Sequence, residues 1–99
     1  MVMIEYLIEP GDEAEFAEVM QHSRRFRLRG GAVSWGLLRG ADDPRRHIEY
    51  FVDENWIERA RRHQRLTEGD ARLRARRLSL HKGTEAPSVT RFVVQTANQ

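Results

Sequence analysis

The chain has 99 residues, of which 39% are hydrophobic and 32% are charged, and its formal net charge is +2. This length and composition predict one globular domain over residues 1–99 and exclude a disordered tail. The absence of cysteine excludes disulfides, a thiol nucleophile and thiolate metal sites. No apolar run is long enough for a membrane span and the first ten residues do not resemble a signal peptide, so we expect a cytoplasmic protein.

A strand and a helix are predicted first. Residues 2–9 alternate in side-chain direction, so that one face is shared by Val2, Ile4, Tyr6 and Ile8. Pro10 and Gly11 end the strand, and Asp12 is the expected N-cap of the helix. The apolar stripe of that helix consists of Phe16, Val19, Met20, Ser23 and Phe26. Gly30 and Gly31 end the helix.

Two strands are predicted next, at residues 32–40 and 47–53, with a turn at residues 41–44 between them. A helix then begins at the candidate cap Asn55, and one of its faces carries Trp56, Ala60 and His63. After a break near Gly69, helix continues to residue 81 with a stripe of Ala71, Ala75 and Leu78, widened by Leu73 and Leu80. The last predicted strand covers residues 89–96.

The resulting order, β-α-β-β-α-β, is that of a ferredoxin-like α+β fold. We therefore expect an antiparallel sheet of strand order 4-1-3-2 with both helices on one face. The face expected to meet the helices carries Val2, Ile4, Tyr6, Ile8, Ile48, Tyr50 and Val52. The open face is expected to carry Met3, Glu5, Leu7, Val33, Trp35, Leu37, Arg39, His47, Glu49, Phe51, Val89, Arg91 and Val93.

Such an open face is too apolar for a solvated sheet and too charged for an ordinary core. Burial against a second copy resolves the conflict, and predicts a two-fold homodimer that closes into a barrel. Glu5, Glu49 and Arg91 are then neighbours, with Trp35 beside Glu49. Either this is a pocket in which a carboxylate handles a proton or binds a cationic ligand and Trp35 stacks on it, or it is a structural network in which Arg91 neutralises Glu5.

Elements of one family pattern recur in order over residues 2–93. They are Glu5-Tyr6, Pro10, Phe16, Met20, Arg24-Arg25, Gly31-Ala32, Trp35-Gly36-Leu37, Asp43-Pro44, Glu49, Phe51, Trp56, Glu58, His63, Arg65, Thr67, Asp70, His81 and Gly83. With them the chain resembles the antibiotic-biosynthesis-monooxygenase-like (ABM) domains, which form dimeric α+β barrels. Within that superfamily it is most similar to the C-terminal domain of some bacterial major facilitator transporters.

The resemblance implies a homodimer and a small-molecule-binding or accessory domain, either free-standing or joined to a membrane transporter at the inner face of the membrane. An alternative is a cofactor-independent monooxygenase acting on a small aromatic substrate, with Glu49, Trp35 and His47 as candidate catalytic residues. A third is a structural dimerisation module. The candidate residues for a small aromatic or cationic ligand are Glu5, Trp35, Phe51, Trp56, His63 and Arg91.

Metal and nucleic-acid chemistry are not predicted. The four histidines lie on different predicted elements without paired ligand spacing, so we expect no metal, and the helix histidine His63 is discounted as a haem ligand. Residues 55–82 hold nine basic and three acidic residues, which is typical of a solvated helix face. Glu49 and Asp53 would flank the aromatic Phe51 on an RNA-binding sheet and repel phosphate, so no nucleic-acid partner is expected.

Overall fold

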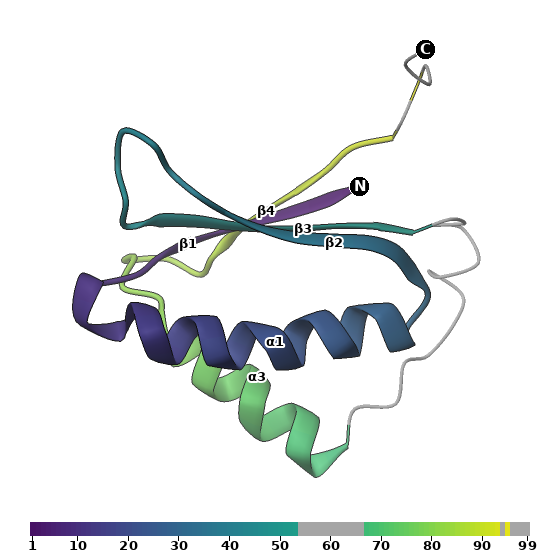
Figure 1. Cartoon of the computed structure of the whole chain (residues 1–99), viewed down its shortest axis with the longest axis horizontal. Helices are drawn as coiled ribbons and strands as arrows, with labels where there is room; N and C mark the ends of the chain where they lie inside the picture. Colours follow the sequence, from purple (N-terminus) through teal and green to yellow (C-terminus); the bar gives the residue numbers. More distant parts are fainter. Residues whose placement is uncertain (54–66, 94, 96–99) are drawn as a thin grey trace.

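A four-stranded antiparallel sheet is covered on one face by two helices (Figure 1). The computed structural model describes residues 1–53, 67–93 and 95. The elements are β1 (Val2–Leu7), a 3-10 turn (Pro10–Asp12), α1 (Glu13–Arg29), β2 (Ala32–Arg39), β3 (Arg46–Asp53), α3 (Glu68–Leu80) and β4 (Ser88–Arg91). The strand order β2-β3-β1-β4 confirms the predicted ferredoxin-like α+β arrangement. The helix predicted after Asn55 lies outside the described residues.

α1 buries the stripe that its sequence predicts. Phe16, Val19, Met20 and Ser23 are buried against the sheet, while Phe26 is half-buried. Asp12 occupies the N-cap position as expected, but its side chain makes no capping hydrogen bond, and the preceding 3-10 turn leads into the helix instead. The chain leaves the helix through Gly31, whose φ of 111° lies in the left-handed region that favours glycine.

α3 differs from its prediction in both its start and its buried face. Thr67 and Asp70 form a capping box, so the helix begins at Glu68 and runs through Gly69 without a break. Its buried side chains are Asp70, Arg77 and Leu80, whereas the predicted stripe of Ala71, Ala75 and Leu78 is exposed. The reason is electrostatic: Asp70 pairs with Arg29 and Arg77 donates to Ser23, so α3 turns its charged side toward α1.

The predicted side-chain directions of β3 are reversed in the structure. Antiparallel pairing places Glu49 opposite Ile4 and Phe51 opposite Val2, and directly opposed residues share a face. His47, Glu49 and Phe51 therefore face the helices. Hydrophobicity alone favours the predicted phase, because Ile48, Tyr50 and Val52 are more apolar than His47, Glu49 and Phe51. The partners of Glu49 on α1 fix the opposite phase.

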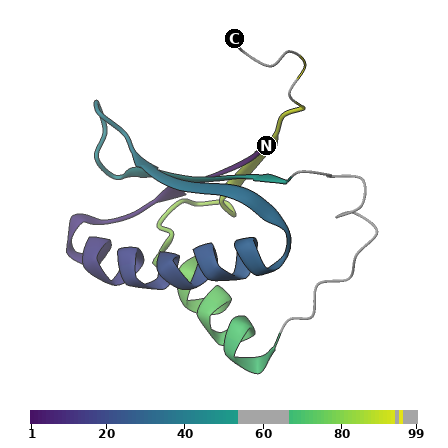
Figure 2. The ribbon, with the colours of Figure 1, turned by 45° about the vertical axis from the view of Figure 1, so that its right-hand side comes forward.

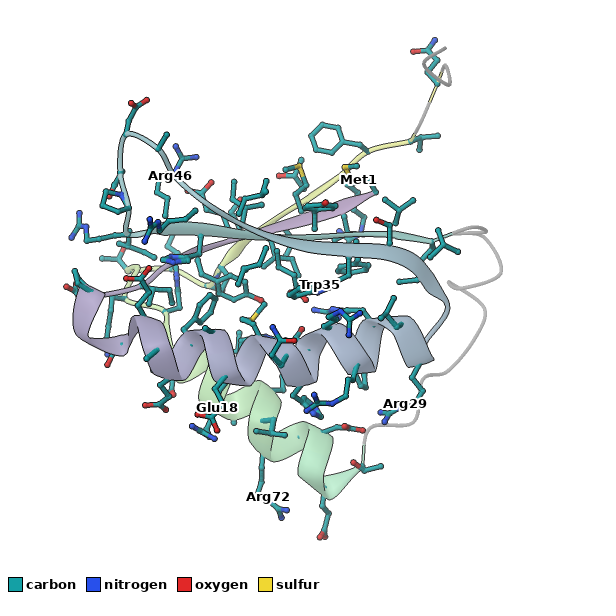
Figure 3. The ribbon with its side chains drawn as sticks, viewed as in Figure 1. Met1, Glu18, Arg29, Trp35, Arg46 and Arg72 are labelled. Carbon is teal, nitrogen blue, oxygen red and sulfur yellow. The ribbon has the colours of Figure 1, made fainter. Side chains whose placement is uncertain are left out.

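The predicted side-chain directions of the outer strands, β2 and β4, are reversed as well. Trp35, Leu37 and Arg39 lie opposite Phe51, Glu49 and His47, and a register shift near the start of β2 sets that alternation. Val89 and Arg91 lie opposite Ile4 and Val2. All five point to the helix side, contrary to the prediction. Figure 3 shows Trp35 between the sheet and α1, with Arg46 on the other face.

With the side-chain directions corrected, the open face of the sheet still carries mostly apolar side chains. Turning the molecule leaves both helices on the same side of the sheet (Figure 2). The open face carries Met3, Leu7, Leu38, Ile48, Tyr50 and Val52. Its charged pair is Glu5 with Arg46, joined by two hydrogen bonds of 2.9 Å. The Tyr50 ring lies across Gly36, at a position where a Cβ would collide with it.

Candidate functional site

The most strongly constrained polar group in the described part of the chain is the carboxylate of Glu49. Its side chain is fully buried between the sheet and α1. Oε2 accepts from the Ser23 hydroxyl at 2.6 Å and from the Trp35 indole at 2.8 Å. Oε1 accepts from the Tyr6 hydroxyl at 3.4 Å. The Arg27 guanidinium donates to both oxygens at 3.4 Å.

These donors keep Glu49 ionised. Burial by itself would raise the pKa of the carboxyl, but the charge of Arg27 and the hydrogen bonds from Ser23 and Trp35 outweigh it and hold the pKa below its ordinary value of 4.5. The same burial raises the pKa of Tyr6 to about 12, so its hydroxyl stays protonated and donates. Glu49 is therefore a negative charge at neutral pH that hydrogen bonds from Ser23, Trp35, Tyr6 and Arg27 hold in place.

A second buried cation, Arg77, lies near this carboxylate and contacts it through Ser23. Arg77 is 8% exposed and donates from Nη1 to the Ser23 hydroxyl at 3.1 Å, while its Nε has no hydrogen-bond partner. Burial lowers the pKa of Arg77 below its ordinary value, although the guanidinium remains charged at neutral pH. Two arginines therefore surround one carboxylate, which leaves this buried cluster with an excess positive charge.

Arg27 connects the cluster to a cleft. Its guanidinium carbon lies 4.5 Å from the centre of the Phe51 ring, and its side chain is largely buried. The cleft has a volume of about 650 Å³, within the range of small-molecule sites. Of the described residues, the charged ones that line it are Arg27, Asp53 and Arg91, and the apolar ones are Met1, Val2, Ile4, Phe51, Val89, Phe92 and Val93.

The structure brings some of the predicted site residues together and separates others. Trp35 lies beside Glu49 as predicted. Glu5 lies on the opposite face with Arg46, and Arg91 lines the cleft, so the expected network of Glu5, Glu49 and Arg91 does not form. The two carboxylates share no pocket, which removes the basis for a cationic ligand. Trp56 and His63 lie outside the described residues.

His47, a candidate catalytic residue, is packed in the core beside Phe16. It is buried against Phe16, with ring centres 5.3 Å apart, and its Nδ1 lies 3.2 Å from the Arg45 carbonyl oxygen. The carbonyl can only accept, so Nδ1 carries the proton in this contact. His47 does not line the cleft.

Sequence reasoning missed four residues of the cluster, and the sequence carried a signal for only some of them. Ser23 was the one hydroxyl in the apolar stripe of α1, which already indicated a buried polar contact. Tyr6 was assigned to the core without a partner for its hydroxyl. Arg27 and Arg77 belong to arginine-rich stretches in which nothing in the sequence distinguishes a buried arginine from an exposed one.

A second charged cluster joins the two helices. Asp70 accepts from Arg29 at 2.8 Å and lies 3.2 Å from His22. The Thr67 backbone N–H also donates to it and holds the pKa of this carboxyl below 3.8. The described residues contain no group of three or more histidine, cysteine or acidic residues suited to a metal ion. Through its contacts with Arg29 and His22, Asp70 holds α3 against α1.

We expect acid to destabilise the fold. Burial lowers the pKa of His22 below 6.5, and the pKa values of Glu49 and Asp70 lie below 4.5 and 3.8. In each case the folded state binds fewer protons than the unfolded state, so the contribution to stability is complete above the unfolded pKa and lost as pH falls through the folded one. The urea midpoint should fall from pH 7 to pH 5.5 and more steeply below pH 4.5. A midpoint that stays constant over this range would contradict the assignment, and Glu49→Gln should flatten the steeper part.

Several solved structures share this fold. A candidate antibiotic biosynthesis monooxygenase from Bordetella bronchiseptica is 21% identical, with a TM-score of 0.69 and coverage of 94% of this chain and 95% of that one. A candidate antibiotic biosynthesis monooxygenase from Nitrosomonas europaea is 15% identical, with a TM-score of 0.69 and coverage of 97% and 91%. A conserved protein from Methanosarcina mazei is 14% identical, with a TM-score of 0.60 and coverage of 91% and 88%. At these identities the likeness shows the fold alone.

Sequence comparison identifies the family. A search of curated proteins finds no match. Neither of the described helices is long and apolar enough to span a membrane. One family model matches the chain over residues 1–99, and its description is transmembrane secretion effector. The structure thus has the ABM-type fold that the sequence predicts, and the chain belongs to the transmembrane secretion effector family.

Proposed function

We propose that this domain binds a small molecule in the cleft beside Arg27 and works as an accessory domain of a secretion transporter, on the cytoplasmic side of the membrane. The observation that carries the proposal is the cleft itself, because its walls are mostly apolar and one wall is a guanidinium fixed by the buried Glu49. Apolar walls with a few convergent polar groups are typical of small-molecule sites. The family match supports the link to a membrane protein.

The geometry favours binding over proton-transfer chemistry. Both carboxylate oxygens of Glu49 accept hydrogen bonds from protein groups, and its pKa lies below the ordinary value. A general base needs a free lone pair within reach of the substrate and a pKa near the working pH. Glu49 and Trp35 therefore act on a ligand through Arg27, as positioning residues.

A neutral fluorescent probe tests the cleft. N-phenyl-1-naphthylamine should bind with enhanced fluorescence, and Val89→Trp should weaken binding about tenfold by filling the cleft from β4. Val33→Trp is the matched control, because Val33 is also an exposed strand valine (59% against 46% for Val89) but does not line the cleft. Equal loss in both variants, or no binding by the wild-type protein, would refute the cleft as the site.

The open face of the sheet supports a homodimer as the working form. It presents apolar side chains together with one acidic and one basic residue, Glu5 and Arg46, so it is complementary to a copy of itself turned about a two-fold axis. Apolar sheet faces are normally covered in folded proteins. In this proposal the two subunits meet through their sheets, and each keeps its own cleft on the helix side.

Sedimentation velocity tests the dimer with two leucine variants. Leu38→Arg places a charge on the open face and should weaken dimerisation about tenfold or more, because the charge is desolvated without a partner. Leu78→Arg is the matched control, since Leu78 is similarly exposed (40% against 47% for Leu38) but lies on α3, away from that face. A wild-type monomer at micromolar concentration would exclude the dimer, as would a Leu38→Arg protein that dimerises like Leu78→Arg.

A cofactor-independent monooxygenase acting on a small aromatic substrate is the second candidate. The observation in its favour is that Trp35, Glu49 and Arg27 form a continuous hydrogen-bonded chain that ends at an apolar cleft. This reading requires oxygen consumption with an aromatic substrate, lost in Glu49→Gln while the circular dichroism spectrum is kept. Dimers that neither bind the probe nor consume oxygen would leave a structural dimerisation module.

A further inference from the structure

We infer that the ligand of the cleft is an organic anion: a flat apolar body that carries a carboxylate or sulfonate group. This inference rests on the proposed function and names the ligand class of the same site. It reverses the expectation of a cationic ligand, which depended on two carboxylates sharing one pocket.

The first support is the charge of the lining. Among the described residues, Arg27 and Arg91 face the cleft against one acidic side chain, Asp53, so this part of the lining carries one net positive charge. Glu49 lies behind the lining, but the positive charge of Arg77 offsets its negative charge, so the buried cluster adds no net negative charge to the cleft. Positive potential beside apolar walls, where water screens charge poorly, attracts an anion more strongly than the same charges attract it in bulk solvent.

The second support is the unused donor capacity of Arg27. A guanidinium has five N–H donors, and Arg27 gives one from Nε and one from Nη2 to Glu49. Its remaining N–H groups have no acceptor among the described residues. Because Glu49 and the Phe51 ring hold the group in place, little side-chain entropy is lost when it binds an anion.

The third support is the position of Arg91. It is the last residue of β4, opposite Val2 on the helix side, and no ion pair with another described residue occupies it. Arg27 reaches the cleft from α1 and Arg91 from the sheet edge, so the two cations come from different elements. Phe51 and Ile4 supply the apolar surface for a flat ring system. One acidic group on an apolar body matches this arrangement.

A matched pair of probes isolates the acidic group. 8-Anilinonaphthalene-1-sulfonate and N-phenyl-1-naphthylamine share one ring skeleton and differ by the sulfonate. Fluorescence titration of the wild-type protein should give a dissociation constant about tenfold lower for the sulfonate, as expected for charge-assisted hydrogen bonds. Arg91→Gln should abolish most of this preference, because it should weaken binding of the sulfonate far more than binding of the neutral probe. Raising the salt concentration should weaken the sulfonate alone.

Arg24→Gln is the control, because Arg24 is an exposed arginine of α1 that does not line the cleft. It should keep the full preference. Arg27→Gln should lower the preference too, with folding checked by circular dichroism because Glu49 loses its partner. Equal affinity for the two probes, or a preference that survives Arg91→Gln, would overturn the anionic class while the cleft still binds the neutral probe. Failure of both probes would refute the cleft and the ligand class together.

Discussion

Replacing Glu49 with alanine is expected to lower the free energy of unfolding by about 3–5 kcal/mol, the usual cost of removing one partner from a buried ion pair. The loss has two physical sources. Arg27 and Arg77 become buried charges without a counter-ion, and the Ser23 and Trp35 donors lose their acceptor. Urea unfolding followed by tryptophan fluorescence measures it, because Trp35 lies in the affected cluster.

Two further variants make the result specific. Glu49→Gln keeps the size and an accepting oxygen, so it should fall between wild type and alanine and remain folded where the alanine variant does not. Glu5→Ala removes the other glutamate of the central strands, whose exposed pair with Arg46 contributes little to stability. If Glu5→Ala destabilised the protein as much as Glu49→Ala, the assignment of the two sheet faces would be wrong.

The order of elements and the sheet topology were predictable because they depend on local signals. Alternation in residues 2–9, the glycine pair after α1 and the length of each segment together lead to one known arrangement of four strands. The phase of β3 was not predictable in this way. Ile48, Tyr50 and Val52 form a more apolar face than His47, Glu49 and Phe51, and only the partners of Glu49 on α1 overcome that preference.

The candidate site depended on that phase, which explains what was predicted and what was missed. The contact of Trp35 with Glu49 survives the reversal because both residues moved to the helix side together. Glu5 and Arg91 were predicted as partners of Glu49 on the open face; Glu5 stayed there and Arg91 turned to the cleft. α3 shows the same limit, since its charged face is buried by contacts with Ser23 and Arg29 that no pattern within the helix encodes.

The core beneath the sheet gives the second large expected effect. Phe16→Ala should cost about 3–5 kcal/mol, as full truncation of a buried phenylalanine does in other proteins. Phe16 of α1 is buried against both central strands: its ring centre lies 5.3 Å from that of Tyr6 on β1 and 5.3 Å from that of His47 on β3. Its removal would open a cavity where α1 meets both strands. The urea midpoint measures the loss.

Phe26→Ala on the same helix is the matched control, because the substitution and its effect on helix propensity are identical. Phe26 is half-buried and packs against His22 and the guanidinium groups of Arg27 and Arg29. Its truncation should cost only about 1 kcal/mol, since much of the ring is already in contact with water. If the two variants lost the same stability, α1 would not be packed on the sheet through Phe16. In that case His47 would not be held on the helix side, and the corrected face of β3, on which the position of Glu49 and the cleft depends, would have to be revised.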